Sequence, residues 1–361
     1  MASENVLTPF IKKLFTTPPT LSPADLGSVL KLVIQGSSSD IQTAAFFTAL
    51  RLTNVDHQPE FISTAAQTVL EFSSTVDINS VDKDGYLDIV GTGGDSQNTF
   101  NVSTSAAIVT AGMGLKVCKH GGKASTSKSG SGDLMAHLGV DLLKVNAAST
   151  PSILSKSKLC FLFAPAFHPA MGKVAPIRAG LGIPTIFNIL GPLLNPAPVR
   201  ARVLGVYAES LGQVYAEAAL AMDEAKGKIA STLVVWGECG LDEISPIGRS
   251  KIWRVDPTTK QITSEWIQPS DFGLPEHSLD LVRSGTPAEN AVLLREILEG
   301  KFGVGPGEPL VDYIVMNSAA LAVTAGAANT WIEGVELARK SISSGAALKS
   351  LEGFVDAVSE V

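Results

Sequence analysis

The stretch YLDIVGTGGDSQNTFNVSTSAAIV, residues 86–109, decides the fold, because it passes from a short apolar strand through a glycine-rich turn into a helix. The turn GTGGD (91–95) lacks the third glycine of the dinucleotide-binding fingerprint, and Asp95 directly follows the glycine pair at 93–94. Glycines let backbone N–H groups approach an anion, and phosphates bind well at helix N-termini. The stretch therefore favours a phosphate-binding strand–turn–helix unit. The alternative is an ordinary tight turn with a capped helix.

Outward from this unit, strand-like and helix-like segments alternate. Further short apolar runs occur at residues 115–119, 158–165, 202–207 and 231–237. Helical patterns stand between several of them, and the region after about residue 285 is helical again. Alternating strands and helices predict an α/β fold with a mostly parallel central sheet covered on both faces.

The region before residue 80 reads as helices alone. A capping serine followed by proline and a carboxylate opens a helix at Ser22–Asp25, and Ser39–Gln42 predicts a capping box. Residues 168–196 form two helical patterns without a clear strand, so we expect them to pack back on the N-terminal helices. The expected domains are a small discontinuous helical one and a larger α/β one: 1–84 with 168–196, and 85–167 with 197–361.

A second glycine-rich loop, KHGGKASTSKSGSGD (119–133), follows the next expected strand. Its three lysines among glycines and hydroxyl groups suit a flexible lid over a polyphosphate. It is not a Walker A loop, because Val117 and Ala124 replace the first glycine and the Ser or Thr of that motif. The alternative is a solvated surface loop without a ligand.

Adjacent carboxylates, Asp242 and Glu243, follow the strand expected at 231–237. Mg²⁺ prefers hard oxygen ligands and is commonly shared by one or two carboxylates and substrate phosphates. Ligands of open α/β sheets bind at the carboxyl ends of the strands, where Ser103 offers another oxygen. We therefore expect a magnesium site there; the alternative is a solvated acidic turn.

Composition excludes several other classes. The net charge of −7 argues against a broad nucleic-acid or acidic-membrane surface. The cysteines Cys118, Cys160 and Cys239 form no CxxC pair, which is typical of reduced thiols. The N-terminus lacks a signal-peptide core, and no run approaches the ~20 apolar residues of a membrane span. We expect a cytoplasmic protein that binds neither nucleic acid nor membrane.

Taken together, the three loops resemble the anthranilate phosphoribosyltransferases, over essentially the whole chain. The resemblance is carried by GTGGD (91–95), NVST (101–104), KHGGKASTSKSGSGDLMAHLG (119–139), FLFAPAFHPAMGKVAPIRAGLGIPTIFNILGPLLNP (161–196) and LDEIS (241–245). It implies a homodimer whose helical and α/β domains are hinged. It also implies transfer of a phosphoribosyl group from phosphoribosyl pyrophosphate (PRPP) to the amine of anthranilate, in tryptophan biosynthesis. No covalent nucleophile is expected.

The resemblance also implies the site residues. PRPP would contact Gly91, Gly94, Asp95, Thr99, Asn101, Val102, Ser103, Thr104, Lys119, His120, Gly121, Gly122, Lys123, Ala124, Ser125, Thr126, Ser127 and Ser131. Mg²⁺ would be held by Ser103, Asp242 and Glu243. Anthranilate would contact Gly91, His120, Gly122, Arg178 and Pro192.

One departure concerns the second loop, where the commoner family pattern is Lys-His-Gly-Asn-Arg. Here Gly122 and Lys123 replace the last two residues, which resembles the fungal branch and removes one side chain from the acceptor site. Two other readings stay open. A pyrimidine nucleoside phosphorylase would have different first and second loops, and a nucleic-acid-binding relative would need a basic surface.

Overall fold

Seven strands form one sheet in the order β3-β2-β1-β4-β5-β6-β7. The computed structural model describes residues 5–123, 129–303 and 305–361. The strands are β1 (Tyr86–Gly91), β2 (Val117–Gly121), β3 (Leu159–Phe163), β4 (Val199–Gly205), β5 (Ser231–Gly237), β6 (Ser250–Val255) and β7 (Ile262–Ile267). The first five are parallel and the last two are antiparallel, so the predicted mostly parallel sheet is confirmed.

Strand β1 lies between β2 and β4, and the chain leaves it in opposite directions across the sheet. At such a switch point the loops after neighbouring strands diverge and leave a crevice at the carboxyl ends. The loops after β1, β2, β4 and β5 all leave from this edge, because these strands are parallel. The sheet therefore brings the three predicted loops together.

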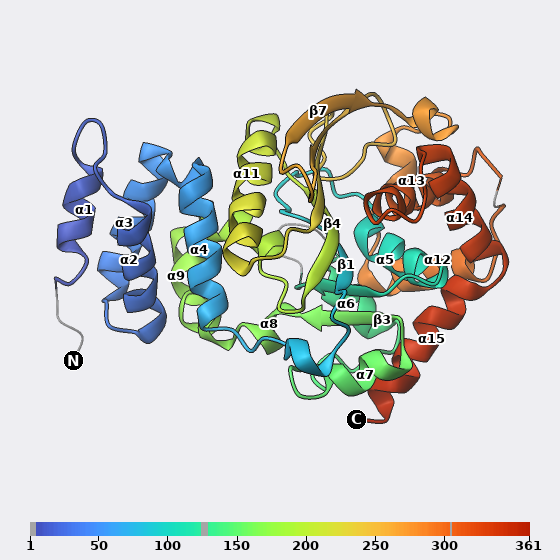
Figure 1. Cartoon of the computed structure of the whole chain (residues 1–361), viewed down its shortest axis with the longest axis horizontal. Coiled ribbons are helices and arrows are strands. Elements are labelled where there is room, and N and C mark those ends of the chain that lie inside the picture. Colours follow the sequence, from blue (N-terminus) through green and yellow to red (C-terminus); the bar gives the residue numbers. More distant parts are fainter. Residues whose placement is uncertain (1–4, 124–128, 304) are drawn as a thin grey trace.

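Helices cover both faces of the sheet (Figure 1). On one face, a hydrophobic core joins the strands to α5 (Val102–Gly112), α13 (Pro309–Thr324), α14 (Trp331–Ser343) and α15 (Ala346–Ser359). Flanking this core are α6 (Ser131–His137), α7 (Thr150–Lys156), α8 (Ala164–Phe167) and α12 (Pro287–Leu298). The predicted helical C-terminal region is thus confirmed, and it packs against the sheet.

A second core lies on the other face and extends into the N-terminal helices. It contains α1 (Thr8–Leu14), α2 (Pro23–Gln35), α3 (Asp40–Thr53), α4 (Pro59–Glu71), α10 (Phe187–Leu190) and α11 (Glu209–Lys226). The short α9 (Ala175–Leu181) packs against α3, so residues from 168–196 lie beside the N-terminal helices, as Figure 1 shows. The domain boundaries given above stay a prediction.

The helix starts were largely as predicted. Ser22 and Asp25 form a capping box, and Ser39 accepts the Gln42 N–H as the cap of α3. The predicted reciprocal half of the second box is wrong, because the Gln42 side chain is used elsewhere: its Oε1 accepts the Leu7 N–H at 3.0 Å. It thereby ties the first helix to the third.

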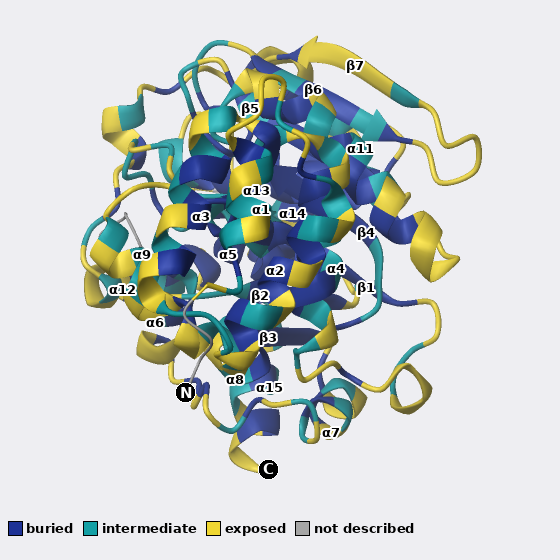
Figure 2. Ribbon diagram, turned by 90° about the vertical axis from the view of Figure 1, so that its left-hand side faces the viewer, coloured by how far each residue is buried: buried dark blue, intermediate teal, exposed yellow. Residues whose placement is uncertain are grey.

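The hairpin of β6 and β7 was missed by the sequence analysis, which assigned no strand after residue 237. Strand β7 is an edge strand with four exposed residues in its centre, visible in Figure 2, so it lacks the apolar pattern of a buried strand. None of the described helices has the length and hydropathy needed to cross a bilayer.

A close approach of α11 to β6 gives a test of this packing. A Cβ on Gly212 of α11 would lie 2.2 Å from the ring of Trp253, which is buried in the second core. Glycine-to-alanine in a helix normally stabilises by about 1 kcal/mol. We expect Gly212→Ala instead to lower the free energy of unfolding by roughly 1–3 kcal/mol in urea denaturation, because overpacking must displace the indole.

The matched control is Gly353→Ala in α15, where an added Cβ meets nothing within 4 Å. This variant should raise the free energy of unfolding by about 0.5–1 kcal/mol. Equal stabilisation by both substitutions would contradict the described contact between α11 and β6.

Candidate active site

A single cavity of about 690 Å³ opens at the carboxyl ends of the strands. Three loops and the segment around α9 and α10 line it. Among the predicted site residues, the lining includes Gly91, Gly94, Asp95, Thr99, Asn101, Ser103, Lys119, His120, Gly121, Gly122, Lys123, Ser131, Arg178, Asp242 and Glu243. Residues that are up to 152 positions apart in the sequence (91 to 243) therefore share one site.

The first and third loops touch at two glycines. A Cβ on Gly91 would lie 2.1 Å from Asp242 Oδ2, and a Cβ on Gly205 would lie 1.5 Å from the Asp242 carbonyl oxygen. Asp242 Oδ2 also accepts the Gly93 N–H at 2.6 Å. The glycines at the ends of β1 and β4 therefore make room for the carboxylate loop that follows β5.

The first and second loops are joined at Asn101, the residue before α5. Its Nδ2 donates to the Ser129 carbonyl oxygen at 2.7 Å, and its Oδ1 accepts the Ser129 hydroxyl at 2.9 Å. On the other arm of the second loop, the Gly122 carbonyl oxygen accepts the Gly132 N–H at 2.8 Å and the Ser131 hydroxyl at 3.2 Å. These contacts hold both ends of the second loop at the cavity.

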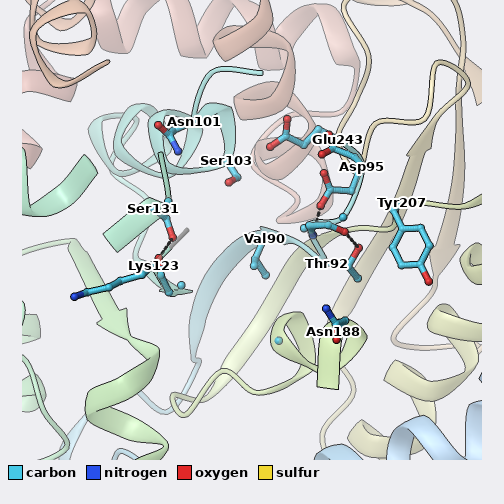
Figure 3. A pocket seen from close by; sticks show the side chains of 18 of the residues that line it. Val90, Thr92, Asp95, Asn101, Ser103, Lys123, Ser131, Asn188, Tyr207 and Glu243 are labelled. Carbon is cyan, nitrogen blue, oxygen red and sulfur yellow. Dashed lines mark hydrogen bonds between the residues drawn. The ribbon is translucent and has the colours of Figure 1, made fainter. Parts of the chain in front are cut away.

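Three carboxylates gather on one side of the cavity: Asp95, Asp242 and Glu243. In Figure 3, Asp95 and Glu243 lie close to each other, and Ser103 points into the cavity from the start of α5. Burial and then the charge of Asp95 raise the pKa of Asp242 to about 6. Burial and then Asp242 raise the pKa of Glu243 well above its usual range. A bound cation would offset both the burial of these carboxylates and their mutual repulsion.

Lys119 is a cation that acts on both Asp242 and Glu243. It is 1% exposed, and its ammonium group donates to the Ile89 carbonyl oxygen. Burial lowers the pKa of Lys119, and the carboxylates of Asp88, Glu243 and Asp242 oppose that shift. One lysine therefore faces more negative charge than it can balance.

The donor set fits Mg²⁺. Two carboxylates and a serine hydroxyl offer hard oxygens beside a cavity that is open to phosphate oxygens and water. Within the described part of the chain, no group of three or more His, Cys, Asp or Glu side chains makes a complete cage for a metal ion. The arrangement suits an ion shared with a substrate and does not suit a structural metal.

His120 lies at the floor of the cavity against a second histidine. The Nε2 atoms of His120 and His168 are 3.0 Å apart, and His120 Nδ1 lies 3.3 Å from the Gly191 carbonyl oxygen. Because a carbonyl oxygen only accepts, His120 Nδ1 carries the proton and its Nε2 accepts from His168. Burial lowers the pKa of both rings, that of His168 to about 4, so both are neutral near pH 7.

Arg178 also lines the cavity, and it comes from α9, which packs against the N-terminal helix α3. Its Nη2 donates to Asn188 Oδ1 at 3.3 Å, and its guanidinium carbon lies 5.6 Å from the centre of the Phe187 ring. Burial lowers the pKa of Arg178, yet no described carboxylate forms an ion pair with it. A half-buried guanidinium beside an aromatic ring suits a planar ligand that carries a carboxylate.

Some predicted residues lie outside this lining. Val102 and Thr104 point into the core and are at most 1% exposed, because α5 begins at Val102 and turns both away from the cavity. Pro192 is also buried and does not line the cavity. The structure therefore does not place the side chains of these three residues in the lining of the cavity. Ala124, Ser125, Thr126 and Ser127 lie outside the described residues.

The structure adds residues that the sequence analysis missed, notably Arg51, Asn188 and Tyr207. Tyr207 follows β4, so its place at a strand end was a usable signal. Arg51 could not be predicted from the sequence, because it lies in the last turn of α3, where an arginine normally faces solvent. Asn188 acts through Arg178, a contact that spans α9 and α10.

Comparison with known proteins agrees with this geometry. Residues 83–348 match the glycosyl transferase family a/b domain, and residues 8–73 match the helical bundle domain of that family. The chain is 46% identical to the anthranilate phosphoribosyltransferase of Saccharomyces cerevisiae, over 99% of this chain and 100% of that one.

Solved structures of the same yeast enzyme superpose closely. Its complex with PRPP and Mg has a TM-score of 0.92 at 45% identity, and covers 100% of this chain and 99% of that one. Its complex with 4-fluoroanthranilate has a TM-score of 0.91 at 44% identity with the same coverage. The chain therefore belongs to the anthranilate phosphoribosyltransferase family.

Proposed function

We propose that this chain transfers the phosphoribosyl group of PRPP to the amine of anthranilate, giving N-(5-phosphoribosyl)anthranilate and pyrophosphate, in tryptophan biosynthesis. One observation carries the proposal. One cavity is lined both by a carboxylate cluster with raised pKa values and by an arginine without a described carboxylate partner. The first suits a magnesium-bound polyphosphate and the second suits an aromatic carboxylate.

On the donor side, the glycine-rich loops would hold PRPP. Gly94 and residues at the start of α5 line the cavity, where a polyphosphate would gain backbone hydrogen bonds and the helix dipole. Lys119 and Lys123 would add positive charge from the second loop. The yeast enzyme has been solved with PRPP and Mg bound, which supports this assignment.

We assign the metal to Ser103, Asp242 and Glu243, because these oxygens border the same part of the cavity. When bound there, Mg²⁺ would neutralise charge on the departing pyrophosphate. Asp95 would remain to face a ribose hydroxyl or a water on the ion. The glycines at 91 and 205 would matter indirectly, since they allow Asp242 to reach the site.

On the acceptor side, Arg178 would pair with the anthranilate carboxylate, and Asn188 would hold the guanidinium in place. Phe187 offers a ring face beside the same position. The neutral His120 lies at the floor, so it would border the acceptor without adding a charge. Near Gly122, an added Cβ would meet only Ala164 Cβ, at 3.9 Å, which leaves open space next to the acceptor.

In the reaction, the bond from ribose C1 to the pyrophosphate oxygen breaks as the anthranilate nitrogen bonds to C1, and the nitrogen releases a proton. The ribose gains positive character and the pyrophosphate gains negative charge. Lys119 and the backbone N–H groups of the loops would stabilise the leaving group. Arg178 would hold the amine in line with C1, which contributes through orientation.

Assembly and motion complete the proposal. We infer a cytoplasmic homodimer in which the helical domain (1–84 with 168–196) moves against the α/β domain (85–167 with 197–361). Arg178 belongs to the first unit and the carboxylates belong to the second. A hinge motion between them would close the acceptor onto the donor and exclude water.

Removing both metal-binding charges tests the donor side. We expect Asp242→Asn combined with Glu243→Gln to lower Mg²⁺-dependent turnover by about 100-fold or more, since charge on the leaving group is no longer neutralised. The rate is measured by loss of anthranilate fluorescence over a Mg²⁺ titration. The melting temperature should stay level or rise, because like-charge repulsion is relieved.

The control for that variant is Glu238→Gln, which removes an exposed acid from the same connection between β5 and β6. It should keep near-normal activity. Near-normal activity of the double variant as well would remove the metal assignment.

Arg178 tests the acceptor side. A hydrogen bond to a charged group is worth about 1.5–3 kcal/mol, so Arg178→Ala should raise the KM for anthranilate by roughly 10–100-fold. The KM for PRPP should change much less. Arg178→Lys should fall between, because it keeps the charge but loses the planar fork. Equal changes in both KM values would instead indicate a structural role for Arg178.

A further inference from the structure

Two side chains one helical turn apart on α13 reach the carboxylate loop. The Tyr313 hydroxyl donates to Glu243 Oε2. Asn317 contacts the next residue of the loop twice: its Oδ1 accepts the Ile244 N–H at 3.2 Å, and its Nδ2 donates to the Ile244 carbonyl oxygen at 3.3 Å. The helix thus forms hydrogen bonds both to the Glu243 carboxylate and to the backbone of the residue that follows it.

Both side chains are buried polar groups, Tyr313 at 0% and Asn317 at 1% exposure. A buried phenol and a buried amide need hydrogen-bond partners, and these two find them on the Asp242–Ile244 loop. Thr99 of the first loop also acts on the phenol, since it works to lower the pKa of Tyr313 against the larger effect of burial. The phenol is therefore bonded to the loop after β5 and is influenced by a residue of the loop after β1.

The geometry leaves one Glu243 oxygen for another ligand. Within the described part of the chain, the hydrogen bonds of the Glu243 side chain use Oε2 alone, and Glu243 lines the cavity. A glutamate has three rotatable side-chain bonds, and the charge of Asp242 repels it. A fixed phenol on Oε2 opposes both effects and holds Oε1 where the cavity begins.

Helix α13 is suited to this task because it is fixed in place. All but three of its residues are buried, and it packs against α5 and α14. The N-terminal turn of α5 carries Ser103, the third proposed ligand. One helix therefore sets the positions of the Glu243 carboxylate, the backbone at Ile244 and the helix that carries Ser103.

We propose that α13 is the positioning element of the Mg²⁺ site, with Tyr313 and Asn317 as positioning residues that do not touch substrate. The inference rests on the proposed assignment of Mg²⁺ to Ser103, Asp242 and Glu243. It goes further in saying that metal affinity depends on a phenol from the C-terminal part of the chain. Partners that orient metal ligands typically change metal affinity 10–100-fold when they are removed.

The test measures metal binding without turnover. Mn²⁺ is titrated into the full chain without PRPP, and free Mn²⁺ is followed by electron paramagnetic resonance. We expect Tyr313→Phe to weaken Mn²⁺ binding by about 10-fold, since ring packing is kept and only the hydroxyl is lost. In turnover assays the Mg²⁺ concentration for half-maximal rate should rise by a similar factor. The KM for anthranilate should stay unchanged.

The matched control is Ser318→Ala, which removes a buried hydroxyl of the same helix that donates only to the Ile314 carbonyl oxygen. It should bind Mn²⁺ like the wild type. If Tyr313→Phe does not fold, Asn317→Ala takes its place, because it removes both hydrogen bonds of the other positioning residue to the Ile244 backbone. It should weaken Mn²⁺ binding by a smaller factor, and melting temperatures identify which variants are folded.

The outcomes separate the two proposals. Wild-type Mn²⁺ binding that is lost in Asp242→Asn with Glu243→Gln, together with unchanged binding in Tyr313→Phe or its substitute, would overturn the role of α13 alone. Wild-type binding that persists in the double carboxylate variant, or that is absent altogether, would overturn the metal assignment, and the role of α13 with it. Weaker binding in Tyr313→Phe but not in Ser318→Ala supports the proposal.

Discussion

Placing several carboxylates in a buried crevice is the constraint on which the rest of this structure depends. Isolated carboxylates avoid burial, and the pKa shifts of Asp242 and Glu243 express that cost. Local features of the fold offset part of this cost. Glycines at 91 and 205 give the loop room, the Gly93 N–H and the Tyr313 hydroxyl donate to the carboxylates, and Lys119 faces them. The remaining negative charge is what makes the crevice receptive to a cation.

The same constraint explains how the cavity is divided. Negative groups come from the loops after β1 and β5, whereas Arg178 comes from a segment that packs with the N-terminal helices. Among the described residues Arg178 forms no ion pair with these carboxylates, so neither charge neutralises the other. Under the proposed function, a magnesium-bound polyphosphate and an aromatic carboxylate would each find a group of opposite charge in the same cavity.

Much of this was predictable from sequence, because the informative signals are local. Glycine-rich turns after apolar strands, at 91–95 and 119–133, placed the first two loops, and parallel pairing placed them at one edge. The edge strand β7 was not predictable, since its exposed centre lacks an apolar pattern. Val102 and Thr104 belong to the NVST motif, yet the helix turns them inward, which a motif cannot indicate.

Contacts between residues that are far apart in the sequence could not be predicted either. Three such contacts depend on how the helices and strands pack against one another. They join His120 to His168, Asn188 to Arg178, and Tyr313 to Glu243. Residues such as Tyr313 and Asn317 read as ordinary members of a buried helix in the sequence. Only the structure shows that their polar atoms face the carboxylate loop.

The most direct measurement is an anthranilate fluorescence assay on the purified chain with PRPP and Mg²⁺, repeated with each component omitted and with EDTA. The account predicts loss of anthranilate fluorescence only when protein, PRPP and Mg²⁺ are all present, and release of pyrophosphate in equal amount. Persistent fluorescence with folded protein and all components present would contradict it, and would mean that the cavity serves a different acceptor.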